Sequence, residues 1–203
     1  RPDDGARLPN LPRFGTQLRM SGEFEQVAWY GRGPHETYAD RKTSGRFGVY
    51  RGEINEQFHR YSRPQETGNK TDVRWMSLSG PKGIGIVAVG DQPLSTSAWP
   101  FEMGELEYQP AAQGAESASG LVPITSKHGA EIETGSTITW NLDVAQMGVG
   151  GDNSWGRPVH DQYSITPQDL TYAFDLVPFL TSETAAEQIF AEALECADAT
   201  AGR

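Results

Sequence analysis

Residues 147–156, with the sequence MGVGGDNSWG, combine the residue types of a shaped loop with one large aromatic side chain. Glycine tolerates backbone angles closed to other residues, so three glycines within four positions predict a tight loop. Asp152, Asn153 and Ser154 can brace it through hydrogen bonds from side chain to backbone. Trp155 would then present a flat apolar plate with one N–H donor, suited to the C–H face of a sugar. The competing interpretation is a turn whose tryptophan packs into the core.

A second stretch, residues 29–41 (WYGRGPHETYADR), is dense in aromatic and charged residues. His35 and Glu36 could act as a general acid and base, as such pairs do in sugar epimerases. Adjacent residues on a strand point to opposite faces, so the pair would have to lie on a loop. The alternative is a loop braced by salt bridges among the charged side chains of this stretch, and general grounds favour it.

The third stretch, residues 63–75 (RPQETGNKTDVRW), carries charges suited to ion pairs between a loop and a strand. Glu66, Asp72 and Arg74 are the residues expected to form such pairs. Arg74 could also stack on Trp75 or on another aromatic ring. A structural role for this stretch is better supported than a catalytic one.

Metal and cofactor chemistry have no supporting pattern. The four histidines, at positions 35, 59, 128 and 160, form no pair at the spacing of metal ligands. The glycine run at 148–151 lacks the Lys-Ser/Thr and the helix that follow a phosphate-binding loop. We therefore expect no metal ion and no cofactor bound by this chain.

Composition restricts the class of partner. The 203 residues carry 17 Lys+Arg against 27 Asp+Glu, a net charge of −10, which disfavours nucleic acid as a partner. No apolar run is long enough to span a membrane, so a membrane partner is not expected. The chain begins at Arg1 without a signal peptide, and we expect a terminus cut from something longer. The lone Cys196 cannot form an internal disulfide, so the redox compartment stays undetermined.

Most of the chain has the pattern of short strands separated by turns rich in glycine and proline. Strands are predicted at residues 16–20, 24–30, 58–61, 72–78, 84–89, 94–99, 137–144 and 172–177. Residues 35–56 are predicted as a long ordered loop, 101–108 as one or two helical turns, and 109–120 as a loop. After Pro178, apolar residues recur at helical spacing.

These elements predict an all-β fold, an antiparallel β-sandwich with a short C-terminal amphipathic helix. The sandwich is expected over residues 1–181 and the helix over 182–203.

The motifs taken together resemble one family. Four motifs follow one another along the chain: residues 11–15 (LPRFG), residues 29–41, residues 64–75, and the glycine loop with Pro158 after it. In order and spacing they are similar to the C-terminal domain of bacterial β-galactosidases of glycoside hydrolase family 2. The likeness covers roughly residues 11–178, almost the whole region of predicted strands.

This resemblance implies a sandwich related to galactose mutarotase that packs against the catalytic barrel of a longer chain. The catalytic glutamates of the family lie in that barrel, so this chain would contribute none. Trp155 matches the tryptophan that forms an apolar platform for the galactoside, and Asp152, Asn153 and Ser154 match its supporting loop. The parent enzyme would hydrolyse terminal β-D-galactosides, with metal ions bound in other domains, and could be a homo-oligomer.

Two departures from the family pattern keep alternatives open. The family domain begins well before the LPRFG motif, and the helix after Pro178 runs past the end of the pattern. There are two alternatives to a β-galactosidase domain. One is a mutarotase-like enzyme that uses His35 and Glu36, and the other is a free-standing carbohydrate-binding module. If Trp155 contacts substrate, its indole should be exposed in the isolated chain.

Overall fold

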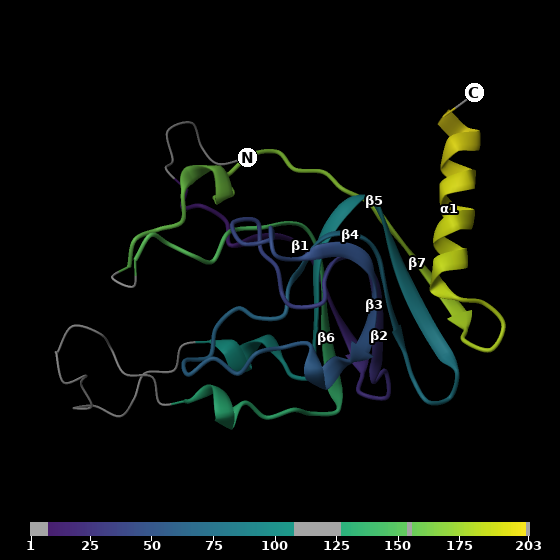
Figure 1. Ribbon diagram of the computed structural model, residues 1–203, viewed down its shortest axis with the longest axis horizontal. Coiled ribbons are helices and arrows are strands. Elements are labelled where there is room, and N and C mark those ends of the chain that lie inside the picture. The colour runs from purple at the N-terminus through teal and green to yellow at the C-terminus, as the bar shows by residue number, and fades with distance from the viewer. Residues whose placement is uncertain (1–7, 108–126, 154–155, 202–203) are drawn as a thin grey trace.

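The computed structural model describes residues 8–107, 127–153 and 156–201, and the side chains of the helix only as far as Ala193. Within them it holds seven strands and one α-helix (Figure 1). The elements are β1 (Arg13–Ser21), β2 (Gln26–Gly33), β3 (Arg46–Glu53), β4 (Lys70–Ser79), β5 (Ile84–Trp99), β6 (Thr137–Gln146), β7 (Phe174–Leu180) and α1 (Ala186–Ala201).

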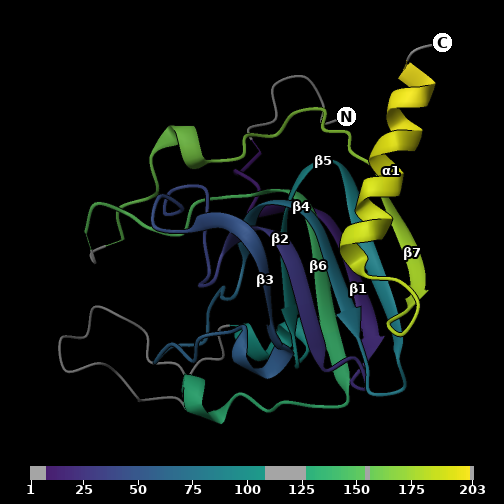
Figure 2. The same ribbon diagram turned by 45° about the vertical axis from the view of Figure 1, so that its right-hand side comes forward.

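All strand pairs are antiparallel, in the order β1-β6-β5-β4-β2-β3, with β7 added beside β5. The long strand β5 changes partner along its length. Its first half, Ile84–Gly90, pairs with β7, and its last residues, Ser95–Trp99, pair with β6. Figure 2 shows these strands side by side, with α1 beside β5 and β7. The strand-dominated architecture with one C-terminal helix confirms the predicted all-β class.

The two faces of the sheet bury different side chains. The main hydrophobic cluster draws on β2, β4, β5 and β6, and includes Ile138, Trp140 and Leu142, the alternating face predicted for β6. Burying each such side chain contributes about 1.5–3 kcal/mol. On the other face, Ala186 and Ile189 of α1 lie in a second cluster with Trp75, Val87 and Val89. The helix therefore covers the sheet around β4 and β5.

The prediction of one loop over residues 35–56 was wrong, because residues 46–53 form strand β3. Every residue of β3 pairs with β2, and the Tyr50 ring lies 5.4 Å from the ring of Trp29. The predicted strand at 58–61 was also wrong. That segment has no strand partner, and Phe58 packs edge-on against Phe101 instead.

Two further predictions can be compared with the structure. A 3₁₀ turn at Met103–Leu106 falls within the segment predicted as one or two helical turns. The two strands predicted at 84–89 and 94–99 are parts of the single strand β5. The loop predicted at 109–120 lies outside the described residues. No helix in the described part of the chain is long and apolar enough to cross a membrane.

Candidate functional site

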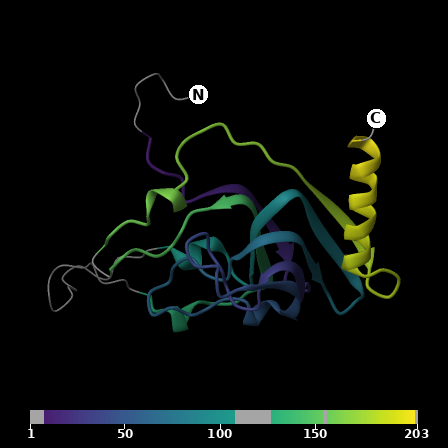
Figure 3. The same cartoon turned by 45° about the horizontal axis from the view of Figure 1, so that its top comes forward.

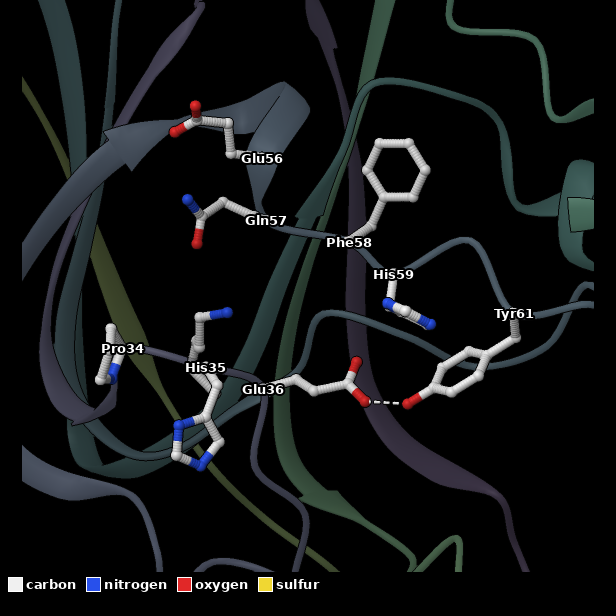
Figure 4. Close-up of a pocket in the computed structure, with 9 residues that line it drawn as sticks. Pro34, His35, Glu36, Glu56, Gln57, Phe58, His59 and Tyr61 are labelled. Carbon is white, nitrogen blue, oxygen red and sulfur yellow. Dashed lines mark hydrogen bonds between the residues drawn. The ribbon is translucent and has the colours of Figure 1, made fainter. Parts of the chain in front are cut away.

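A cavity of about 320 Å³ lies among the loops that follow β2 and precede β4 (Figure 4). It is lined by Pro34, His35, Glu36, Glu56, Gln57, Phe58, His59, Tyr61 and Lys70. Both residues of the predicted acid–base pair are therefore on its wall. The Gly33-Pro34 peptide bond at the end of β2 is cis and leads the chain into this loop.

Glu36 is held by four donors. Its carboxylate accepts hydrogen bonds from the Gly68 amide at 2.7 Å and the Thr67 hydroxyl at 3.1 Å, and from the Tyr61 hydroxyl and the Arg41 guanidinium. Burial acts to raise the pKa of Glu36, but these bonds outweigh burial and bring the pKa below its ordinary value. The carboxylate is thus fixed as an anion that braces two loops, as the salt-bridge interpretation predicted.

His35 takes a different direction from its neighbour. Its ring is exposed, and Nε2 lies 2.9 Å from the Ser44 hydroxyl. Figure 4 shows the Glu36 side chain directed toward Tyr61 and the His35 ring directed away from it. The two side chains share a cavity, but the structure does not bring them together as a hydrogen-bonded pair.

The remaining charges of the two stretches tie loops to strands. Asp72, in β4 with a positive φ of 57°, pairs with Arg32 of β2 at 2.5 Å and with Lys42 at 3.0 Å. These cations lower the pKa of Asp72 despite the opposing effect of burial. The Arg74 guanidinium lies 5.6 Å from the centre of the Phe47 ring, so it stacks on a ring other than Trp75.

Sequence reasoning expected an ion pair of Glu66 but missed its partly buried cluster with Arg13 and Asp143, in which the side chains of Arg13, Glu66 and Asp143 are 15%, 23% and 3% exposed. Arg13 lies 2.7 Å from the Glu66 carboxylate and 3.5 Å from that of Asp143. Burial raises the pKa of Glu66 to about 7 and that of Asp143 to about 6, with Arg13 opposing both shifts. A charged residue inside the predicted strand 137–144 was the available signal, because such a residue needs a partner when it is buried.

The glycine loop is tied down by Asp40, from the stretch 29–41. Its carboxylate accepts the Val149 amide at 3.2 Å and the Gly150 amide at 2.7 Å. A Cβ at Gly148 would lie 2.7 Å from the Asp40 carboxyl carbon, so a larger residue there would push this anchor away. Residues 147–153 form a loop, in which none of Gly148, Gly150 and Gly151 adopts a positive φ. The described anchor of this loop comes from 109 residues earlier in the chain.

The predicted loop residues are placed only in part. Asp152 is exposed, and its carboxylate lies 2.7 Å from His160, whose hydrogen bond lowers the pKa of Asp152. Asn153 is also exposed. Ser154 and Trp155 lie outside the described residues, so the expected exposure of the indole stays a prediction. Figure 3 shows the segment after β6 running over the end of the molecule opposite α1.

Within residues 8–107, 127–153 and 156–201, no three His, Cys, Asp or Glu side chains gather to hold a metal ion. The described site therefore consists of a braced polar cavity and a separate glycine loop anchored by Asp40. The cavity wall holds two carboxyl groups, those of Glu36 and Glu56, and the carboxylate of Glu36 is already engaged by four hydrogen-bond donors.

Comparison with known proteins gives one family. The model of the β-galactosidase small chain matches residues 2–176. A β-galactosidase from Priestia megaterium is 34% identical over 172 residues, 84% of this chain and 15% of that protein. A β-galactosidase from Halalkalibacterium halodurans is 34% identical over 174 residues, which are 85% of this chain and 16% of that protein. A β-galactosidase from Kluyveromyces lactis is 32% identical over 170 residues, which are 83% of this chain and 14% of that protein. The chain thus spans about 15% of the length of these relatives.

Proposed function

The chain belongs to the β-galactosidase small-chain family, and from this membership we propose that it is the C-terminal, non-catalytic domain of a β-galactosidase. The parent enzyme hydrolyses terminal β-D-galactosides, such as lactose, with retention of configuration. One glutamate attacks the anomeric carbon and a second acts first as acid and then as base. Both belong to a catalytic barrel that packs against this chain.

Trp155 is this domain's contribution to the substrate site. Its indole forms an apolar platform for the sugar, and such a contact is worth about 1 kcal/mol by analogy with other aromatic contacts. That amount tunes binding without supplying catalysis. Asp152, Asn153 and Ser154 support the loop. Metal ions needed by the parent are bound in other domains, and its assembly as a homo-oligomer belongs to the same proposal.

The observation that carries this proposal is the anchoring of the glycine loop by Asp40. Two motifs of the family resemblance, distant in sequence, meet at this contact. An ordinary surface turn does not require a carboxylate that accepts hydrogen bonds from two successive backbone amides. It also does not require a glycine at Gly148, where a Cβ would collide with that carboxylate. The arrangement suits a loop that must hold its terminal side chain in one place.

Two assays of the purified chain test the proposal. With a chromogenic β-galactoside we expect no turnover, because the proposal assigns both catalytic glutamates to the barrel of the parent enzyme. Titration with galactose and lactose should show millimolar binding at best, lost in Trp155→Ala, because most of the pocket belongs to the barrel. Turnover by the pure chain would refute the proposal.

The same assays separate the alternative functions. Tight galactose binding by the chain alone would favour a free-standing carbohydrate-binding module. Interconversion of galactose anomers, lost in His35→Ala, would favour a mutarotase-like enzyme.

A further inference from the structure

Lys70 differs from the other lysines of this chain. The sequence contains four lysines, and the other three each form an ion pair with a carboxylate. The pairs are Lys42 with Asp72, Lys82 with Glu23, and Lys127 with Glu105. Lys70 is 2% exposed and lines the 320 Å³ cavity, yet among the described residues it has no carboxylate within ion-pair distance.

The contacts of the Lys70 amine are weak. Its Nζ lies 3.4 Å from the Gly68 carbonyl oxygen, which is long for a hydrogen bond, and 5.0 Å from the centre of the Trp29 ring. An ammonium group has three donors to satisfy, and burial without a counter-ion favours the neutral amine. Burial lowers the pKa of Lys70 to about 8, with the Glu36 carboxylate opposing the shift.

From this geometry we propose that Lys70 is a reactive amine on the wall of the cavity, where small aldehydes, including the open-chain form of a sugar, condense with it. The cavity is within the size range of small-molecule sites. Desolvation in a pocket without a partnering carboxylate is a recognised way to make a lysine nucleophilic at neutral pH.

The condensation is a balanced addition and elimination. The lone pair of the neutral Nζ attacks the aldehyde carbon, a C–N bond forms, and the carbonyl electron pair moves to oxygen. A proton passes from nitrogen to that oxygen to give a carbinolamine. Loss of the second nitrogen proton with the hydroxyl group releases one water and leaves an imine. His59 and Tyr61 line the same cavity, where the Tyr61 hydroxyl donates to the Glu36 carboxylate.

Reductive labelling of the whole chain tests this site. The chain is incubated with glycolaldehyde and sodium cyanoborohydride, which delivers hydride to the imine carbon, and the labelled peptides are quantified by mass spectrometry. At pH 7.5 we expect Lys70 to react several-fold faster than Lys42 or Lys82. Its rate should rise with a midpoint near pH 8, below the value of about 10.4 for an ordinary lysine.

Two variants sharpen the result. Glu36→Gln removes the negative charge that favours the ammonium form, so the midpoint for Lys70 should move to lower pH. Lys70→Arg keeps a cation beside Trp29 and should abolish only the peptide label at this position. An unlabelled Lys70 beside a labelled Lys82 in the wild-type chain would overturn the proposal. So would a Lys70 midpoint near pH 10.

Discussion

Glu36 and Glu66 are the same residue type in neighbouring loops, yet the protein shifts their pKa values in opposite directions. Both are taken out of water. Glu36 accepts hydrogen bonds from four groups, whereas the described partner of Glu66 is the Arg13 guanidinium, and its second oxygen accepts no hydrogen bond from the described residues. The number of donors, together with burial and the neighbouring carboxylates, therefore decides which carboxylate is stabilised as an anion.

Removing Arg13 should have the largest effect, because Glu66 and Asp143 share it. Arg13→Met leaves two buried carboxylates without their cation, and breaking such a pair costs about 3–5 kcal/mol. The loss should be greater at pH 8 than at pH 5, since both groups can protonate in acid. Urea unfolding followed by fluorescence at the two pH values measures it.

The matched control is Arg19→Met. Arg19 pairs with Glu102 on the surface, where the two side chains are 67% and 62% exposed. An exposed pair of this kind contributes less than about 1 kcal/mol. Equal losses from the two arginine variants would remove the distinction between the buried cluster and a surface pair.

Glu36→Gln tests the carboxylate that has four hydrogen-bond donors. The glutamine amide cannot accept all four hydrogen bonds, and its NH₂ group would point at groups that are themselves donors. We therefore expect the free energy of unfolding to fall by about 2–3 kcal/mol at pH 7. Because the pKa of Glu36 is lowered in the folded state, its contribution is present above the ordinary value of 4.5 and disappears as the pH falls through the folded value. Wild type and variant should therefore converge in acid, as thermal unfolding between pH 3 and 7 would show. A constant difference would contradict this account.

Glu66→Gln should change the pH dependence in the other direction. The pKa of Glu66 is raised to about 7 in the folded protein, so its contribution is fully present below about pH 4.5 and is lost as the pH rises through 7. Between pH 5 and 8 the wild type should lose on the order of 2 kcal/mol through this group. The variant, which keeps Asp143, should lose distinctly less. Parallel stability profiles for the two proteins would show that Glu66 is not the responsible group.

The sequence was informative where the stabilising interaction is local. Strand β6 was predicted because Ile138, Trp140 and Leu142 alternate within one segment. Strand β3 was missed because pairing with β2 and the packing of Tyr50 on Trp29 stabilise it, and no local pattern contains those contacts. The position at which β5 changes partner is likewise set by two other strands.

The site divides in the same way. The ion pair of Glu36 with Arg41 lies within one motif, so the charges of that motif could suggest it, whereas the other three donors to Glu36 come from residues 61–68. The cluster of Arg13, Glu66 and Asp143 joins three distant segments. Arg13 and Glu66 stand in motifs of the resemblance, but Asp143 lies within strand β6, and no local pattern connects the three residues. The anchoring role of Asp40 could not be derived from sequence for the same reason.

Substitution of Asp40 should have the smallest effect on stability, and it tests whether the number of donors determines how firmly a carboxylate holds a loop. Like Glu36 it braces a loop by accepting hydrogen bonds, but it has two donors, both backbone amides, where Glu36 has four. Asp40→Asn keeps one acceptor and loses the charge, so we expect a loss of about 1 kcal/mol and faster hydrogen exchange at Val149 and Gly150. Asp152→Asn, on the exposed side of the same loop, is the matched control and should leave those two amides unchanged. If donor number governs how firmly a carboxylate holds a loop, the exchange rates should rise in the first variant alone. Unchanged exchange in Asp40→Asn would mean that the loop is held by other contacts.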